Sequence, residues 1–227
     1  MRVALTVDIG STHEGSLSRL KQHIDVAATM SAPVAVKCQL FAKEMEGPNI
    51  WLDPELYKAG YEYAKSKGIM YYASCFDLGT LRYAASVDDT LVKLAYSKRL
   101  ELCCEAGRLF KHVIMSGDYL DACLALAKPK FYRLLCLPVY PVWHPIRAEQ
   151  IPWANYDGWS SHCLGIDEDY RVLQAAKADD VQDFLVEKHV RHEGPPGCPD
   201  ACFAVTWGSI YDLLQTPEIE WTPLSLS

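Results

Sequence analysis

Polar side chains stand at the ends of several apolar runs, and their types are those that catalytic sites use. Lys37 and Lys93 each follow an apolar run, and His162 and His189 follow two others. An ammonium group there needs a counter-charge, which comes either from a carboxylate of the chain or from an anionic ligand. Two neutral imidazoles suit a divalent ion, although a single histidine is more often a hydrogen-bonded core or loop residue. The pattern indicates a shared anion and metal site if the fold brings these four residues together.

Three serines and one loop extend this pattern. Ser74, Ser116 and Ser160 also end apolar runs, and beside two lysines their hydroxyl groups would form a cradle for a phosphate or carboxylate. The segment Asp8–Gly15 follows the first apolar run, and its two glycines allow the backbone to approach a ligand. Because its spacing matches neither a dinucleotide-binding fingerprint nor a P-loop, an ordinary strand-to-helix loop is the alternative.

Net charge, apolar stretches and cysteine content limit the classes of protein to which the chain can belong. A formal net charge of −7 argues against a nucleic-acid or acidic-membrane surface. No apolar stretch reaches the roughly 20 residues that span a bilayer, and no signal-peptide pattern opens the chain. The nine cysteines are an odd number and are scattered, so we expect a reducing cytoplasmic location. The Cys-x3-Cys spacing of Cys198 and Cys202, downstream of His189 and His192, is poor for a structural zinc site.

Eight apolar runs alternate with helical patterns, which predicts an α/β fold with parallel strands. We expect a single (β/α)8 TIM-type barrel over residues 1–215 and a C-terminal tail over 216–227, with an open doubly wound sheet as the alternative. In a barrel the carboxyl ends of all strands meet on one face, where catalytic residues gather. The predicted strands are Val3–Val7, Pro33–Cys38, Ile69–Ser74, Leu91–Leu94, His112–Met115, Tyr132–Leu137, Gly158–Ser160 and Asp183–Glu187.

Helix signals lie between these runs. Apolar residues recur at helical spacing after Ser16, which could cap that helix, and again after Asp53-Pro54, a helix-start signal. A third helical pattern begins near Tyr170. The segment Pro138–Trp153 is rich in proline and tryptophan, which is typical of a shaped loop.

Read in order, nine motifs resemble those of the N-acetylneuraminate (sialic acid) synthase family. The family's opening E-I-G-x-N-H-x-G is matched by Asp8–Gly15, and its E-[KR]-H-[FV] by Glu187–Val190. The other matching segments are Val36–Gln39 (V-K-x-Q), Ala73–Phe76 (S-T-P-F), Lys93–Tyr96 (K-I-G-S), Ile114–Asp118 (I-L-S-T-G), Leu134–Pro141 (L-L-H-C-x-x-x-Y-P), Gly158–His162 (G-x-S-D-H) and Pro196–Asp200 (P-G-P-D).

The resemblance implies a β/α barrel that condenses phosphoenolpyruvate with a sugar aldehyde such as N-acetylmannosamine. The product would be a 2-keto-3-deoxy sugar acid, and phosphate would be released. His162 and His189 would hold a divalent metal, most simply Mn²⁺, with Mg²⁺ or Co²⁺ as alternatives. The implied catalytic residues are Asp8, Lys37, Lys93, His162 and His189, and the implied substrate-binding residues are Gln39, Ser74, Ser116, Tyr140, Ser160 and Asp200.

Departures from the family pattern keep other functions open. Asp8 replaces a glutamate, Ser161 an aspartate, Pro138 an amide and Tyr96 a serine. The family's C-terminal antifreeze-like domain has no counterpart in the sequence, so the acceptor aldehyde can differ from N-acetylmannosamine. The alternatives are a metal-dependent barrel hydrolase or sugar isomerase, and a non-catalytic ligand-binding descendant. We expect no nucleic-acid or membrane partner, and a homodimer is left open.

Overall fold

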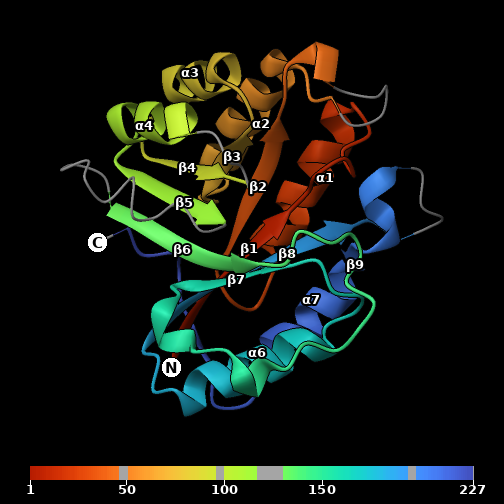
Figure 1. The fold of residues 1–227 in the computed structure, drawn as a ribbon. Helices are drawn as coiled ribbons and strands as arrows, with labels where there is room; N and C mark the ends of the chain where they lie inside the picture. The colour runs from red at the N-terminus through yellow and green to blue at the C-terminus, as the bar shows by residue number, and fades with distance from the viewer. Residues whose placement is uncertain (46–50, 96–99, 117–129, 194–197, 227) are drawn as a thin grey trace.

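Eight parallel strands close into a barrel in the computed structural model, which describes residues 1–45, 51–95, 100–116, 130–193 and 198–226 (Figure 1). Each strand pairs with the next in sequence, and β1 pairs with β8 so that Asp8 lies opposite His189. The closed barrel is confirmed, and the open sheet is excluded. The strands are β1 Arg2–Asp8, β2 Val34–Leu40, β3 Tyr71–Cys75, β4 Leu91–Leu94, β5 His112–Ser116, β6 Lys130–Cys136, β7 Gly158–Ser161 and β8 Asp183–Arg191.

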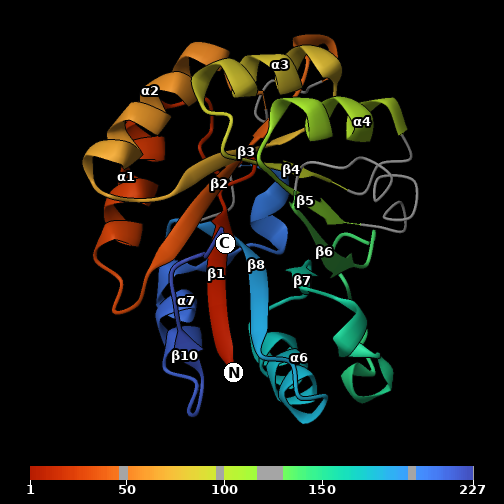
Figure 2. The same cartoon turned by 90° about the vertical axis from the view of Figure 1, so that its left-hand side faces the viewer.

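Helices cover the outside of the barrel (Figure 2). Two begin at the predicted signals: the Ser16 side chain accepts from the Arg19 amide, and that of Asp53 from the Glu55 amide. The loop after β6 contains single 3₁₀ turns at Ala148–Gln150 and Trp153–Asn155, in agreement with a shaped loop. The helices are α1 Leu17–Ala28, α2 Pro54–Ser66, α3 Leu78–Val87, α4 Leu100–Leu109, α6 Asp167–Ala178 and α7 Trp207–Leu214. None of the described helices is long and apolar enough to cross a bilayer.

Side-chain alternation divides the barrel interior into an apolar floor and a polar mouth, because residues two apart on a strand share a face. The floor is a cluster of buried residues from seven strands: Ala4, Ala35, Tyr72, Leu91, Ile114, Leu134 and Leu185. The remaining strand, β7, contributes Gly158. A Cβ added to this glycine would lie 2.0 Å from the Leu185 carbonyl oxygen. Further along the same strands, the inward residues become charged or hydroxylated, as in Asp8, Lys37 and Glu187.

The segment after α7 closes the opposite end of the barrel. It was expected to be a tail, and it adds a short strand, β10 Glu220–Trp221, which pairs with β1. Leu224 and Leu226 then pack against the apolar floor. A second short strand, β9 Val205–Thr206, extends the sheet beside β8. These pairings leave no pattern in the sequence because each strand has only two residues.

Candidate active site

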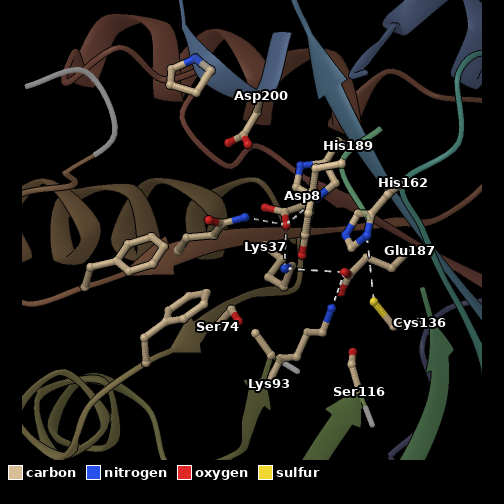
Figure 3. Close-up of a pocket in the computed structure, with 16 residues that line it drawn as sticks. Asp8, Lys37, Ser74, Lys93, Ser116, Cys136, His162, Glu187, His189 and Asp200 are labelled. Atoms are coloured by element: carbon tan, nitrogen blue, oxygen red, sulfur yellow. Dashed lines mark hydrogen bonds and ion pairs between the residues drawn. The ribbon is translucent and has the colours of Figure 1, made fainter. Parts of the chain in front are cut away.

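A pocket of about 240 Å³ lies at the mouth formed by the carboxyl ends of the strands (Figure 3). Ten of the eleven predicted site residues line it: Asp8, Lys37, Gln39, Ser74, Lys93, Ser116, Tyr140, His162, His189 and Asp200. The eleventh, Ser160, does not line the pocket, but its hydroxyl accepts a 3.0 Å hydrogen bond from Lys93 Nζ. Residues from separate strands therefore meet as the barrel topology requires. Of the motif residues, Tyr96, Gly117, Asp118, Pro196 and Gly197 lie outside the described parts of the chain.

Two lysines and two carboxylates form a connected chain of charges on one side of the pocket. Lys37 Nζ lies 2.6 Å from Asp8 Oδ2 and 3.5 Å from Glu187 Oε1. Lys93 Nζ donates to the same Glu187 oxygen. All four residues are between 1 and 3% exposed. The counter-charges that the sequence left open are thus supplied by the chain itself, and the four groups together carry no net charge.

Glu187 is the site residue that reasoning from the sequence missed. It stands in the segment Glu187-Lys188-His189, and strand alternation was a usable signal, because Glu187 must share a face with His189. Lys188 points to the opposite face, where it is buried against Asp169 at 2.9 Å and donates to Ser161 Oγ. This pairing places Ser161, one of the departures from the family pattern, outside the pocket.

We call these four residues (Asp8, Lys37, Lys93 and Glu187) the charge chain. Their charges shift one another's pKa values. Burial opposes the ionisation of Glu187, but Lys37 and Lys93 outweigh it and lower the pKa of this carboxyl to about 2. Asp8 responds in the same way: burial is overcome by Lys37 and His189, and its pKa lies well below the ordinary value. Burial lowers the pKa of Lys93, and the Glu187 carboxylate opposes that shift. Both carboxyl groups are therefore ionised at neutral pH.

Two buried hydroxyl groups in the pocket have no hydrogen-bond partner within the described structure. These are Ser74 Oγ on β3 and Ser116 Oγ on β5, at 0 and 4% exposure. Lys93, on the strand between them, lies along the same side of the pocket (Figure 3). Its ammonium group has three N–H donors, and the hydrogen bonds to Ser160 and Glu187 use two of them. Buried polar groups are normally paired, so these atoms are available for a ligand.

The two histidines lie close enough to share a metal ion. Their ring centroids are 5.4 Å apart, and bonds from metal to imidazole nitrogen are about 2.0–2.1 Å long. His162 Nδ1 lies 3.1 Å from the Leu137 carbonyl oxygen, which fixes the proton on Nδ1 and leaves the lone pair on Nε2. Burial, and then the neighbouring His189, lower the pKa of His162 to about 3, so this ring is neutral.

His189 offers a second nitrogen, and the ion would keep open positions. His189 Nδ1 is buried without a partner, and Nε2 lies 3.3 Å from Asp8 Oδ2. Within the described ranges, no group of three or more histidine, cysteine or acidic residues is arranged to hold a metal. A metal held by the two imidazoles would therefore take its remaining ligands from water or substrate. This donor set fits a divalent ion of the first transition row.

The residues expected to face the sugar have partners of their own. Gln39 Nε2 donates to Asp8 Oδ2 at 2.9 Å. The Tyr140 ring packs over His162, with 4.0 Å between centroids. Asp200 Oδ2 accepts from the Ser11 amide at 2.6 Å. Each residue still lines the pocket, so all three can contact a bound molecule on one side while the protein orients them from the other.

The cysteines form no zinc site among the described residues. Cys202 is exposed and donates to the Pro199 carbonyl oxygen, while His192 packs against His23 with 3.8 Å between ring centroids. Only one cysteine side chain reaches the described pocket: Cys136 Sγ lies 3.8 Å from His162 Nδ1. Burial raises the pKa of this thiol, which makes it a poor nucleophile.

The chain matches no protein-family model and no curated protein sequence, but its fold matches solved structures. The barrel is similar to that of sialic acid synthases. A sialic acid synthetase from Leptospira borgpetersenii has a TM-score of 0.78 at 20% identity, and the match covers 94% of this chain and 82% of that one. A spore coat polysaccharide biosynthesis protein from Bacillus subtilis has a TM-score of 0.76 at 21% identity, covering 94% and 66%.

A related fold is found in another synthase. A truncated 3-deoxy-D-arabino-heptulosonate 7-phosphate synthase from Thermotoga maritima has a TM-score of 0.71 at 12% identity, covering 94% of this chain and 84% of that one. At these identities the comparisons establish a shared barrel fold. The resemblance that the sequence motifs predict is confirmed at that level.

Proposed function

We propose that this protein is a metal-dependent synthase that condenses phosphoenolpyruvate with a sugar aldehyde and releases phosphate. The observation that carries the proposal is the pair of unpartnered hydroxyls, Ser74 and Ser116, on either side of Lys93. Together they offer two O–H donors and an ammonium group to the oxygens of one anion. The Leptospira synthetase of the same fold was solved with citrate, a carboxylate anion.

The pocket residues suggest how each end of the reaction is held. Ser74, Ser116 and Lys93 would bind the phosphate and carboxylate of phosphoenolpyruvate and orient its enol carbon. That carbon forms a bond with the aldehyde carbon, water adds to the cationic carbon left behind, and the C–O bond to phosphate breaks. The carboxylates of Asp8 and Glu187, which line the same pocket, would stabilise the positive charge on this carbon.

A divalent ion held by His162 and His189 supplies Lewis acidity for the aldehyde oxygen when bound. Mn²⁺ is the ion we propose, with Mg²⁺ and Co²⁺ as alternatives. Because the four charges of the lysines and carboxylates cancel, the phosphate and carboxylate of phosphoenolpyruvate would add uncompensated negative charge to a buried site. A dication bound with the substrate would offset most of that charge. We therefore expect the metal and phosphoenolpyruvate to increase each other's affinity.

The test is phosphate release from phosphoenolpyruvate with Mn²⁺ and a panel of sugar aldehydes. We expect His162→Ala and Lys93→Ala each to lower the rate by about 100-fold or more, since both remove groups that contact the reacting molecules. His144→Ala is the matched control, because His144 is exposed in the loop after β6 and lies outside the pocket. Release that needs no metal, or no release with any aldehyde, would overturn the proposal.

One observation favours a second candidate, a metal-dependent hydrolase or sugar isomerase. Both lysines are already paired with carboxylates, so the pocket does not require an anionic substrate. Calorimetry separates the two candidates. The synthase requires that phosphoenolpyruvate bind in the presence of Mn²⁺, whereas the second candidate predicts metal binding without any binding of phosphoenolpyruvate.

A further inference from the structure

The rim of the pocket is apolar over three neighbouring strands. Phe41 directly follows β2, Phe76 directly follows β3, and Ala95 directly follows β4. All three line the pocket. The rings of Phe41 and Phe76 are stacked, with 3.9 Å between centroids and 17° between planes, and both side chains are half-buried. We call these three residues the phenylalanine wall.

Each residue of the wall stands two positions after a polar residue of the same pocket. Gln39 precedes Phe41, Ser74 precedes Phe76, and Lys93 precedes Ala95 at this interval. Residues two apart on an extended chain share a face and are separated by roughly 6.5 Å. The pocket therefore changes from polar to apolar within one such step, in the same direction on three strands. With phosphoenolpyruvate held at the polar level by Ser74 and Lys93, an acceptor bound beside it would meet the apolar level with one of its substituents.

Hydroxyl groups would be poorly accommodated at the wall. Two phenyl rings and a methyl group provide no hydrogen-bond donor or acceptor, and a hydroxyl that loses water there without a partner is penalised. An apolar substituent has the opposite preference, because its contact with the rings removes apolar surface from water. The wall thus distinguishes between aldehydes that have the same polar end.

We propose that the phenylalanine wall is a specificity subsite that receives an apolar substituent of the acceptor aldehyde, such as the acyl group of an acylated amino sugar. The inference rests on the proposed function for the identity of the acceptor as an aldehyde. It adds that the affinity for the acceptor increases with the apolar surface of the substituent. Substituents larger than an acetyl methyl group therefore bind more tightly. Aldehydes that carry only hydroxyl groups are poor acceptors.

The test measures binding of unreactive acceptor analogues, so it needs no turnover. The probes are sugar alcohols made by reducing 2-amino sugars, with N-acetyl, N-butanoyl or N-benzoyl groups, beside the hexitol that has a hydroxyl in place of the acylamino group. Calorimetry with Mn²⁺ present gives each dissociation constant. We expect the dissociation constant to decrease about fourfold for each methylene that the wall buries. The hexitol should bind most weakly.

Variants connect this gradient to the wall. Phe76→Ala should weaken binding of the benzoyl probe about tenfold and change binding of the hexitol little. Phe76→Leu should keep most of the gradient, which separates lost apolar contact from lost folding. Trp143→Ala is the matched control, because Trp143 is 69% exposed near the same mouth but does not line the pocket. Equal affinities for all probes, or a gradient that persists in Phe76→Ala, would overturn the proposal.

The phosphate-release assay distinguishes this inference from the proposed function. If the acylated probes bind with the expected gradient but no aldehyde supports phosphate release, the wall stands and the synthase proposal fails. If phosphate is released but the probes show no gradient, the synthase proposal stands and the specificity subsite is wrong. If neither result is obtained, both are wrong.

Discussion

Three serines of the site differ in what their hydroxyl groups do in the free protein. Ser74 and Ser116 are buried and have no partner in the described parts of the chain, whereas Ser160 accepts from Lys93 and donates to Glu187. We expect Ser74→Ala and Ser116→Ala to leave the free energy of unfolding unchanged or slightly higher, because no internal hydrogen bond is lost. Each should weaken phosphoenolpyruvate binding by about tenfold, since a hydrogen bond to a charged ligand disappears.

Ser160→Ala is the matched comparison. It removes a hydroxyl that is bonded within the charge chain, so it should lower stability by ~1–3 kcal/mol. Urea unfolding and calorimetry measure the two effects separately. Destabilisation by Ser74→Ala or Ser116→Ala equal to that of Ser160→Ala would show that these hydroxyls have internal partners and are not kept for a ligand.

Glycine is required at position 10 because Asp200 approaches it closely and because its backbone is left-handed. Its φ is +50°, and a Cβ there would lie 2.3 Å from Asp200 Oδ2. Gly10→Ala should therefore push Asp200 out of place and weaken acceptor binding several-fold. Gly165→Ala is a control with a similar φ of +64° but no atom within 4 Å of the added Cβ. Both changes cost backbone strain of ~1–2 kcal/mol, so only the loss of binding should separate them. Equal losses of affinity would contradict this account.

At the residue scale, the sequence identified ten side chains that the pocket brings together. The lysines, histidines and serines were indicated by their types and their places at strand ends, because a parallel barrel collects strand ends on one face. Tyr140 and Asp200 lie outside the strands and were expected only from the family resemblance. Reasoning from the sequence missed the pairing of Glu187 with both lysines. That contact joins β8 to β2 and β4 across the barrel, and the sequence of one strand does not indicate which distant strand faces it.

At the scale of elements, β7 is held close to β8 by the absence of a side chain. A Cβ on Gly158 would lie 2.0 Å from the Leu185 carbonyl oxygen and 2.6 Å from Leu134 Cδ2. Gly158→Ala should force these strands apart, lower stability by ~3 kcal/mol or more, and weaken ligand binding through the displacement of Ser160 and Glu187.

Gly208→Ala is the control: this glycine is exposed in α7, its nearest contact would be 3.6 Å away, and alanine favours a helix. Thermal unfolding compares them, and a Gly158→Ala melting temperature equal to that of Gly208→Ala would contradict the packing argument.

The strands were predictable because each is an apolar run with a polar end, and all eight predicted runs overlap an observed strand. Some strand boundaries differ from the predicted ones. The last strand was expected to end at Glu187 but continues to Arg191, because β1 and β9 supply pairing partners for its later residues. The two-residue strands β9 and β10 were not predictable, since such short pairings depend on the completed barrel rather than on local pattern.

At the scale of the whole molecule, the buried charge chain predicts how stability depends on pH. Burial opposes ionisation of Glu187, yet the two lysines lower its pKa from 4.5 to about 2. The unfolded state therefore binds more protons between these values, and stability must fall as pH falls from about 4.5 toward 2. Asp8, whose pKa is also lowered, adds to the same loss.

Glu187→Gln tests this dependence. The variant should be less stable at neutral pH by ~3–5 kcal/mol, because two ammonium groups remain buried with one fewer counter-charge. Its stability should also fall less steeply between pH 4.5 and 3 than that of the wild type, as measured by urea unfolding. Glu218→Gln, at an exposed ion pair with Lys177, should change both properties far less, because solvent screens this pair. Identical pH slopes in the wild type and Glu187→Gln would contradict the assignment.

The most direct test of the central claim is a crystal structure with Mn²⁺ and phosphoenolpyruvate bound. The account predicts that manganese, located by anomalous scattering, lies between His162 and His189. It also predicts that oxygens of phosphoenolpyruvate accept hydrogen bonds from Ser74 and Ser116, whose hydroxyls have no partner among the described residues. A metal held elsewhere, or a phosphoenolpyruvate molecule that leaves both hydroxyls unpaired, would contradict it.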